Sequence, residues 1–308
     1  MNMYFISKLM KVVRYPRIGL LMLLNKASFL IPDKLYLQWM YRLHIRKKLD
    51  LNHPVTFNEK LQWLKLYNRC PEYIRLVDKV EAKKYVAEKI GEEYIIPTLG
   101  VWNDPDEIDF DNLPDQFVLK CNHNSGLGMC ICKDKSKLDI KKVKAELRRG
   151  LNQNYFLYGR EWPYKDVPRK ILAEKFMVDE NGDGDLEDYK LMCFDGKVYC
   201  TFVCSERYDK NGLKVTFFDI NWKRLPFERC YPSSEKTVSI PKNYHKMIRF
   251  AEALSQEIPF IRTDFYEING KLYFGELTFY PGSGWERFTP DEWDKRLGEL
   301  IKLPSPTL

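Results

Sequence analysis

Two apolar, β-rich runs joined by a short polar loop constrain the fold of this chain more than any other feature. Residues 117–132 read FVLKCNHNSGLGMCIC, with Lys120 near the end of the first run and Gly126 and Gly128 in the loop. A P-loop would need the pattern GxxxxGK[ST] running directly into a helix. Here the loop lacks that lysine and leads into a second strand-like run. The pattern therefore predicts a glycine-containing hairpin.

Such a hairpin has two interpretations. A glycine-containing loop between strands is most often only a turn. It can also lie over the triphosphate of a nucleotide, because glycines permit close approach of the backbone and a lysine on a neighbouring strand supplies positive charge. In the second interpretation, the phosphate-binding candidates are Lys120, Asn124, Ser125, Gly126 and Gly128.

A second hairpin, near the C-terminus, carries acidic residues. Residues 262–278 form two β-rich runs around the turn signal Asn269-Gly270. A two-residue turn would pair Ile268 with Lys271 and place Glu276 on the face opposite Asp264. A three-residue loop with Gly270 in a left-handed bulge would instead pair Glu267 with Lys271 and set Arg262 against Glu276.

We predict the bulged turn for this hairpin. It would make Asp264 and Glu276 diagonal neighbours on one face, together with Thr278, and the two acids could then hold Mg²⁺ between them. The alternative, an exposed hairpin with salt bridges, is the commoner fate of such residues. The Pro-Gly-Ser-Gly loop at 281–284 favours a ligand site, because it follows directly on the acidic strand.

The excess of basic over acidic residues is confined to the N-terminus of the chain. The formal net charge is +7, but residues 1–48 carry ten Lys or Arg and one acid, a local charge of +9 that leaves the other 260 residues at −2. The longest apolar run there is far shorter than the ~20 residues that span a membrane. We expect a basic amphipathic helical segment over residues 1–50, which either contacts an anionic membrane or another polyanion, or packs on the main domain with solvated basic faces. We expect no nucleic-acid partner.

The eight cysteines indicate a reducing compartment. They lie mostly within apolar strand-like runs, and no secretory signal precedes them. Cys130-x-Cys132 and Cys200-x3-Cys204 lack the paired spacing of a zinc site. We therefore expect buried thiols in a cytoplasmic protein, with the N-terminal segment as its candidate contact to the inner face of the membrane.

Strand-like and helix-like segments interleave without the regular alternation of a doubly wound parallel sheet, which favours an α+β fold with antiparallel sheets. Helical patterns cover residues 59–67, with Thr56 or Asn58 near the N-cap, 73–90, with Gly91 as C-cap candidate, about 140–151, and about 244–257. The β-rich runs cover residues 117–132, 171–178, 188–204, 213–220 and 261–279.

The lysine-bearing strand, the glycine hairpin and the terminal acidic pair occur in the order typical of ATP-grasp enzymes, and the chain resembles that superfamily. Asp78-Lys79 is similar to the family's Asp-Lys element that opens a helix. The resemblance implies that Lys79 and Lys120 are the first and second phosphate ligands. Residues 171–177 are similar to the strand and hinge over adenine, which implies base contacts from Glu174, Lys175, Phe176 and Met177.

Further matches follow along the chain. Residues 188–198, which begin with Asp188, resemble the next strand pair, with Lys190 where many members place a cationic phosphate contact; Arg207 follows in a comparable position. Arg262-x-Asp264 and Glu276-x-Thr278 match the Arg-x-Asp and Glu-x-Asn elements, with Thr278 in place of the usual asparagine. The resemblance implies catalytic roles for Lys190, Arg207 and Arg262, and one or two Mg²⁺ ions on Asp264, Glu276 and Thr278.

The sequence FGELTFYPGSG at 274–284 resembles the TupA-like, teichuronopeptide-biosynthesis branch of bacterial ATP-grasp proteins, found in capsule and cell-surface polysaccharide gene clusters. The likeness covers roughly residues 50–300. It implies an ATP-grasp fold, in which two α+β subdomains grip ATP. The expected units are the basic segment 1–50, a helical region 51–116, a lid subdomain 117–177 with the glycine hairpin, and a C-terminal subdomain 178–308 with the Mg²⁺-binding acids.

The resemblance also implies an activity. ATP-grasp ligases join a carboxylate to an amine through an acyl phosphate. The branch suggests that an amino acid or other amine is linked to a uronic acid or similar carboxylate, attached to a polysaccharide. ATP, Mg²⁺ and the two substrates are then the expected partners.

Three other functions compete with this one. A glycosyltransferase of the same pathway would need a sugar-nucleotide motif, for which Asp183-Gly-Asp185 is the nearest candidate, although no apolar strand precedes it. A kinase would require a catalytic Asp and Asn on one loop, and no such element is present. A non-catalytic nucleotide-binding or polysaccharide-binding protein stays open because of Thr278.

Overall fold

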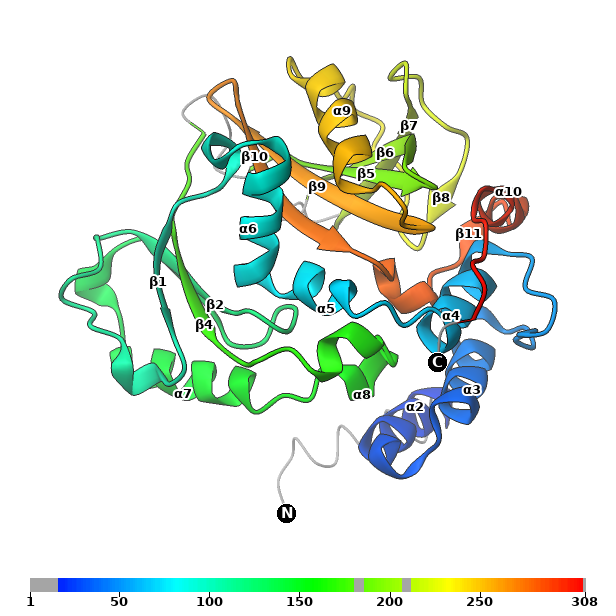
Figure 1. Cartoon of the computed structure of the whole chain (residues 1–308), viewed down its shortest axis with the longest axis horizontal. Coiled ribbons are helices and arrows are strands. Elements are labelled where there is room, and N and C mark those ends of the chain that lie inside the picture. The colour runs from blue at the N-terminus through cyan, green and yellow to red at the C-terminus, as the bar shows by residue number, and fades with distance from the viewer. Residues whose placement is uncertain (1–15, 180–185, 207–211, 307–308) are drawn as a thin grey trace.

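The computed structural model describes residues 16–179, 186–206 and 212–306. Asp183, Asp185 and Arg207, singled out from the sequence, lie outside the described residues. Within them, helices and antiparallel sheets form a mixed α+β structure, as predicted (Figure 1). No helix of the described part is both long and apolar enough to span a bilayer.

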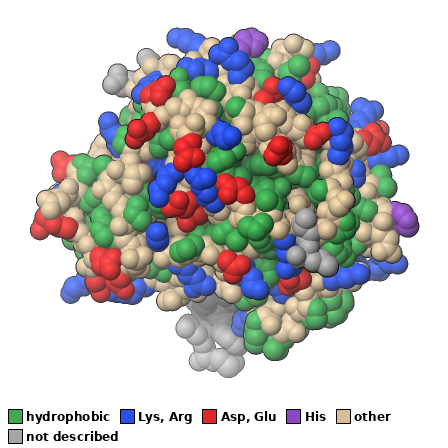
Figure 2. Space-filling model, in the orientation of Figure 1, with side chains coloured by type: hydrophobic (Ala, Val, Ile, Leu, Met, Phe, Trp, Pro, Cys, Tyr) green, Lys and Arg blue, Asp and Glu red, His purple; other side chains and the backbone are tan. Residues whose placement is uncertain are grey.

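The N-terminal segment forms a helical lobe. It contains α2 (Pro16–Lys26), the short helix η1 (Ser28–Leu30) and α3 (Asp33–Ile45). A separate cluster of buried side chains holds it together, including Tyr36, Met40 and Ile45, and Trp285 of the main body packs into this cluster. Figure 2 shows apolar side chains also at the surface of this lobe, at the lower right of the view.

Helix α4 (Phe57–Tyr67) begins at a capping box. The Glu59 amide donates to Thr56 Oγ1 at 3.2 Å, and the Glu59 carboxylate accepts from the Thr56 amide at 3.0 Å. Two backbone N–H groups at the helix start are thereby satisfied. The prediction that Thr56 lies near the N-cap is confirmed.

The helical pattern over 73–90 forms two helices, not one. Helix α5 (Glu72–Val77) ends at Asp78, and α6 (Lys79–Ile90) begins there. Asp78 has extended backbone angles, and its side chain accepts from the Val80 amide at 2.8 Å, so it caps a new helix. The apolar spacing continues across this break, which is why periodicity alone does not detect it.

A four-stranded antiparallel sheet contains the predicted glycine hairpin. Its strand order is β1-β4-β2-β3, with β1 (Thr98–Trp102), β2 (Phe117–Cys121), β3 (Met129–Cys132) and β4 (Ile171–Lys175). Helix α7 (Ile140–Leu151) packs on it through Val143 and Leu147, within a core cluster that includes Phe117 and Leu119. The hairpin and the helix at 140–151 are confirmed.

A five-stranded antiparallel sheet contains the acidic hairpin. Its order is β10-β9-β5-β6-β7, with β5 (Asp188–Phe194), β6 (Lys197–Ser205), β7 (Lys214–Asp219), β9 (Phe260–Ile268) and β10 (Lys271–Thr278). Helix α9 (Tyr244–Leu254) packs on β5, β6 and β9. The remaining elements are the helices α8 (Phe156–Gly159) and α10 (Glu292–Leu300), the strands β8 (Glu228–Arg229) and β11 (Phe288–Thr289), and the short helices η2 (Glu92–Tyr94), η3 (Pro105–Glu107), η4 (Lys135–Lys137), η5 (Trp162–Lys165) and η6 (Pro281–Gly284).

The predicted register of the acidic hairpin is wrong at the turn. Ile268 pairs with Lys271, so Asn269 and Gly270 form a two-residue turn, and both have the positive φ that a type I′ turn requires. The register then shifts at a β-bulge between Phe274 and Glu276. The prediction placed one extra residue in the turn, and the structure has it at this bulge instead. One extra residue in a strand moves all later side chains to the other face, so Glu276 still lies on the face of Asp264.

As a result, Glu276 lies directly opposite Asp264, and Thr278 lies opposite Arg262. The predicted pairing of Glu276 with Arg262 is therefore wrong. The two acids, Asp264 and Glu276, are closer neighbours than the predicted diagonal pair would be. Gly275 occupies the bulge, where a Cβ atom would lie 3.1 Å from the Asp264 carbonyl oxygen.

Candidate active site

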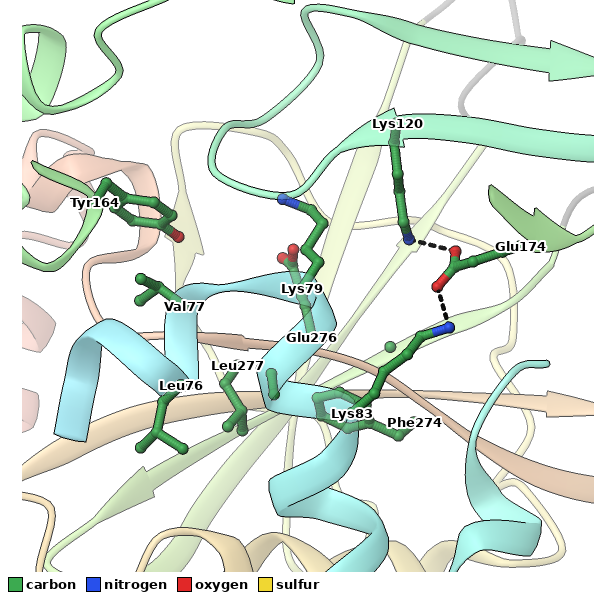
Figure 3. Close-up of a pocket in the computed structure, with 12 residues that line it drawn as sticks. Leu76, Val77, Lys79, Lys83, Lys120, Tyr164, Glu174, Phe274, Glu276 and Leu277 are labelled. Atoms are coloured by element: carbon green, nitrogen blue, oxygen red, sulfur yellow. Dashed lines mark ion pairs between the residues drawn. The ribbon is translucent and has the colours of Figure 1, made fainter. Parts of the chain in front are cut away.

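A pocket lies where the two sheets face each other across α6. Lys120 and Glu174 line it from the four-stranded sheet, residues 274–277 line it from β10, and Lys79 and Lys83 line it from α6 (Figure 3). Residues far apart in the chain therefore converge. Of the three lysines and two acids that the sequence predicted to meet, Lys79, Lys120 and Glu276 line this pocket, and Lys190 and Asp264 lie outside its lining. Leu76, Val77, Ala82 and Tyr164 complete the lining.

Lys79 reaches the glycine loop from the first turn of α6. Its Nζ donates to the Asn124 carbonyl at 2.5 Å. Burial lowers the pKa of Lys79, since the charged form loses hydration; Glu276 and Glu174 oppose this shift and Lys120 adds to it, and the resulting pKa is about 8. An anion entering the pocket would compensate this positive charge.

Lys120 and Lys83 share one carboxylate. Glu174 accepts from Lys120 at 2.5 Å and from Lys83 at 2.6 Å (Figure 3). The pairing follows from the register, because Val118 on β2 opposes Glu174 on β4, and Lys120 lies two residues further on the same face. Although Glu174 is buried, the two lysines lower its pKa, and it stays ionised.

On the five-stranded sheet, Arg262 binds both acids of the hairpin. Its Nε and Nη2 donate to the two oxygens of Asp264 at 2.6 and 2.7 Å, and Nη2 also donates to Glu276 Oε1 at 2.6 Å. Lys190 adds a second cation on Asp264 and bonds Asp188 at 2.5 Å. Burial raises the pKa of Asp264, while Arg262 and Lys190 oppose that shift.

Glu276 is the accessible acid of this group. Its side chain is 44% exposed, whereas that of Asp264 is 1% exposed. Burial would raise the pKa of Glu276, but Arg262, Lys190 and Lys79 lower it to about 2. Thr278 Oγ1 donates to Glu276 Oε1 at 3.1 Å. Glu276 is therefore ionised at neutral pH and able to meet a cation from the pocket.

These acids fit a Mg²⁺ site that ligand oxygens complete. Among the residues the structure describes, no three His, Cys, Asp or Glu side chains are grouped to hold a metal by themselves. Mg²⁺ is commonly held by one or two carboxylates together with phosphate oxygens and water. Glu276 and Asp264, directly paired, would supply the carboxylates, and Thr278 lies beside Glu276 with its hydroxyl oxygen.

The glycine loop is anchored at its first residues. Asn122 donates to Asp78 at 2.9 Å and to the Pro168 carbonyl at 2.8 Å, and its carbonyl accepts from the Lys79 amide. Asn124 donates to the Gly150 carbonyl at 3.2 Å, so its side chain points toward α7 while its carbonyl meets Lys79. The loop therefore joins the start of α6 to the end of α7.

The remaining loop residues differ in their surroundings. Ser125 and Gly126 are exposed, and a Cβ on Gly126 would meet no atom within 4 Å, which leaves space for a ligand. Gly128 is buried, and its Cβ would lie 2.8 Å from Gly150 Cα. Gly128 thus permits close packing on α7, so the predicted close approach to a ligand does not describe its position.

The residues of the predicted adenine-binding stretch also differ in their surroundings. The Glu174 carboxylate is held by lysines inside the pocket, Lys175 is exposed, and Phe176 and Met177 are half-buried directly after β4. Asp188 pairs with Lys190 on β5 and is not one of the residues that line the pocket. Arg207 belongs to a segment outside the described residues.

Sequence reasoning did not single out several residues of the site, among them Lys83 and Asn122. Lys83 follows Lys79 by four residues and so lies on the same face of α6, a spacing visible in the sequence. Asn122, the first residue after β2, had no sequence signal that separated it from the other loop residues. Its role depends on contacts with residues more than 40 positions away.

Two buried side chains, Lys65 and Glu161, hold the loop that follows the acidic strand. Gly282, Ser283 and Gly284 all have positive φ, and the Ser283 carbonyl accepts from Lys65 at 2.7 Å. Ser283 Oγ donates to Glu161 at 2.5 Å. Burial lowers the pKa of Lys65 to about 7 and raises that of Glu161. The left-handed conformation of this loop is thus fixed by side chains of α4 and of the segment before η5.

Comparison with solved structures gives distant similarity. The D-alanine–D-alanine ligase of Bacillus anthracis, complexed with ATP, is 16% identical, with 73% of this chain and 63% of that chain covered and a TM-score of 0.43. The D-alanine–D-alanine ligase of Helicobacter pylori is 15% identical, with coverages of 80% and 69% and a TM-score of 0.44. N5-carboxyaminoimidazole synthetase of Staphylococcus aureus is 12% identical, with coverages of 66% and 44% and a TM-score of 0.40.

The chain spans less than two thirds of the length of two of these three proteins. No curated protein matched it. TM-scores below 0.5 do not establish a family, so the family assignment depends on the match to a family model. The model of the TupA-like ATPgrasp family matches residues 59–302, which is most of the chain and includes every pocket-lining residue. The chain therefore belongs to the TupA-like ATP-grasp family.

Proposed function

We propose that this protein is an ATP-dependent carboxylate–amine ligase that forms an amide bond through an acyl phosphate. The observation that carries the proposal is the convergence of Lys79, Lys83 and Lys120 with Glu276 on one pocket between the two sheets. Membership of the ATP-grasp superfamily supports the reaction type.

The lysines of the pocket are suited to a triphosphate. Lys83 and Lys120 share the single carboxylate of Glu174, and Lys79 lies in the same pocket on a backbone carbonyl, so the three lysines retain positive charge for phosphate oxygens. Lys79 and Lys120 would hold these oxygens, and the loop at 122–128 would cover them and exclude water, which would otherwise hydrolyse an acyl phosphate. In this proposal the lid comprises residues 117–177 together with β1, which pairs with β4.

The paired acids are suited to Mg²⁺. Asp264 and Glu276 would hold one or two ions, with Thr278 beside them. Bound there, Mg²⁺ would neutralise charge on the β- and γ-phosphates. Arg262 and Lys190 would fix the orientation of both carboxylates, since they already bond Asp264.

The reaction has two steps. A carboxylate oxygen of the first substrate attacks the γ-phosphorus, the bond to the β-phosphate oxygen breaks, and ADP leaves. The amine nitrogen of the second substrate then attacks the acyl carbon, phosphate leaves, and the nitrogen loses a proton. Arg262 would stabilise the acyl phosphate and then the tetrahedral oxyanion, as a fixed cation in a buried site. Lys190 would add a phosphate contact, and Arg207 would meet a substrate carboxylate.

The family also suggests the substrates. We propose a uronic acid or similar carboxylate on a cell-surface or capsular polysaccharide precursor, and an amino acid or other amine as its acceptor. The reaction would take place in the cytoplasm. If the precursor carries a lipid, the reaction would take place at the inner face of the membrane. This assignment depends on the resemblance of residues 274–284 to the teichuronopeptide-biosynthesis branch, and the pocket itself does not distinguish among carboxylates.

The test is incubation of the purified chain with Mg·ATP and a panel of uronic acids and amino acids. ADP and phosphate released only when both a carboxylate and an amine are present would support the ligase. Sugar-nucleotide consumption would identify a glycosyltransferase instead. Nucleotide binding without turnover in the whole panel would identify a non-catalytic nucleotide-binding protein.

A further inference from the structure

The N-terminal lobe exposes an unusual share of apolar surface. In the described part of the chain, twenty large apolar side chains are exposed, and eight of them lie within residues 18–39. The most exposed are Leu30 at 73%, Phe29 at 68% and Leu23 at 62%, and the others are Ile18, Leu20, Met22, Leu35 and Trp39. Single exposed apolar residues need no explanation, but a concentration in one short segment indicates a surface that is covered in use.

This lobe is fixed to the body of the protein. Arg160, which is 2% exposed, donates to the Ser28 carbonyl at 2.5 Å and to the Ile31 carbonyl at 3.1 Å. Its Nε also pairs with Asp33 at 2.8 Å, and its guanidinium lies 4.2 Å from the centre of the Tyr36 ring. The exposed apolar side chains therefore belong to a lobe that has its own buried core and is hydrogen-bonded to the body of the protein; we call this lobe the platform.

Basic side chains outnumber acidic ones on the platform. Lys26 and Lys34 are exposed beside the apolar residues. Asp33 is the single acid in residues 1–48, and it is paired with Arg160 and with Arg69. The segment thus presents cations to its surroundings without an acid that is free to neutralise them.

We propose that α2, η1 and the start of α3 dock on an anionic lipid bilayer surface, with Leu23, Phe29 and Leu30 entering the apolar layer and Lys26 and Lys34 meeting the lipid headgroups. Mixed apolar and basic surfaces bind anionic membranes, and an aromatic side chain such as Trp39 is suited to the boundary between headgroups and acyl chains. A second copy fits less well, because it would place Lys26 and Lys34 of one copy against the same lysines of the other. If the protein is the proposed ligase, this docking would place it beside a lipid-linked substrate. Binding to the bilayer requires neither nucleotide nor turnover, so it can be tested independently of the ligase activity.

The experiment is flotation of the full chain, without nucleotide, on vesicles of phosphatidylcholine alone or with about one third phosphatidylglycerol. We expect binding to the anionic vesicles that weakens as salt is raised. The variant Leu23→Ser/Phe29→Ser/Leu30→Ser should reduce the partition coefficient by about tenfold or more, because these side chains are exposed and would lose burial only in the membrane. The matched control is Leu99→Ser/Val101→Ser/Ile240→Ser, which removes exposed apolar groups elsewhere.

Charge is tested in the same assay. Lys26→Gln/Lys34→Gln should weaken binding several-fold, and Lys137→Gln/Lys197→Gln, with two exposed lysines elsewhere, should not. Equal binding to both kinds of vesicle, or equal loss in the test and control variants, would overturn the proposal. A dimer in light scattering that the triple variant abolishes would assign the surface to a second copy instead. Ligase activity in solution is measured separately, so failure of either proposal leaves the other distinguishable.

Discussion

The two sides of the pocket carry opposite charge. On the side of α6 and the four-stranded sheet, the lining contains Lys79, Lys83 and Lys120 and the single carboxylate of Glu174, a formal excess of two positive charges. On the five-stranded sheet, Glu276 lines the pocket; it belongs to an ion-pair network with Asp188, Asp264, Lys190 and Arg262, which lie outside the lining, and this network has an excess of one negative charge.

This difference suggests a division of tasks. The positive side can bind phosphate oxygens directly, because its lysines have few acids to satisfy. The negative side is ordered by its own ion pairs and leaves one accessible carboxylate, that of Glu276, for a cation. A nucleotide triphosphate with Mg²⁺ would complement both sides at once. The following experiments alter one side at a time.

The largest effect is expected from Glu276→Gln. The amide keeps the shape of the side chain but removes the charge that would hold Mg²⁺, so kcat/KM should fall by about 10³-fold with little change in thermal unfolding. Steady-state kinetics with varied Mg²⁺ measures this loss. The exposed residue Glu235 gives the control Glu235→Gln. Full activity in Glu276→Gln would remove the metal-binding role from this side.

Glu174→Gln tests the positive side through stability. It leaves Lys83 and Lys120 without their carboxylate, and we expect the free energy of unfolding to fall by about 3 kcal/mol in urea denaturation. Mg·ATP should recover more stability in this variant than in the unaltered protein, because phosphates supply the missing negative charge. Glu252→Gln, which removes an acid paired with the exposed Lys197, should cost under about 1 kcal/mol. Equal stabilisation of both proteins by Mg·ATP would argue against phosphate contacts at Lys83 and Lys120.

Lys79→Met should weaken Mg·ATP binding by about 30-fold in calorimetric titration, since a charged hydrogen bond contributes about 2 kcal/mol. Lys79 also bonds the Asn124 carbonyl, so thermal unfolding of the variant must be measured beside its affinity. The exposed Lys84 on the same helix gives the control Lys84→Met. Affinity unchanged in Lys79→Met would place the triphosphate elsewhere.

The pKa of Lys79, lowered to about 8 by burial, predicts a pH dependence. Below pH 8 the side chain is charged in the free protein, and above it the neutral form dominates and must bind a proton before it can pair with phosphate. The affinity for Mg·ATP should therefore fall about fivefold from pH 8 to pH 9. Lys79→Arg stays charged throughout and should show a flatter profile. Parallel profiles for the two proteins would contradict the assignment.

The smallest effect is expected at Thr278. Its hydroxyl bonds Glu276 at 3.1 Å, and Thr278→Val removes that bond while keeping the shape. We expect about a threefold loss in kcat/KM, corresponding to less than 1 kcal/mol. Thr278→Asn, which introduces the residue usual at this position in the superfamily, should stay within about threefold of the unaltered protein. A loss near that of Glu276→Gln would instead make Thr278 a principal metal ligand.

Several local features could be predicted from the sequence, because each depends on neighbouring residues. The capping box at Thr56, the glycine hairpin at 117–132 and helix α7 are set by side chains within a few positions of each other. The order of the lysine and acidic motifs along the chain also sufficed to identify the fold family.

The register of the acidic hairpin could not be predicted from its turn. Asn269-Gly270 suits both a two-residue turn and a bulged one, and the deciding feature is the bulge at Gly275, six residues after the turn begins. The break at Asp78 escaped periodicity for a related reason, since apolar spacing continues across it. Lys83 was visible by spacing, but its burial depends on Glu174, 91 positions away.

The most direct test of this account is a crystal structure with Mg²⁺ and a non-hydrolysable ATP analogue. We predict that the nitrogen atoms of Lys79 and Lys120 lie within about 3.2 Å of phosphate oxygens of one nucleotide, with Glu276 on Mg²⁺. A nucleotide bound outside the pocket between α6 and the two sheets, or triphosphate oxygens remote from both lysines, would contradict it.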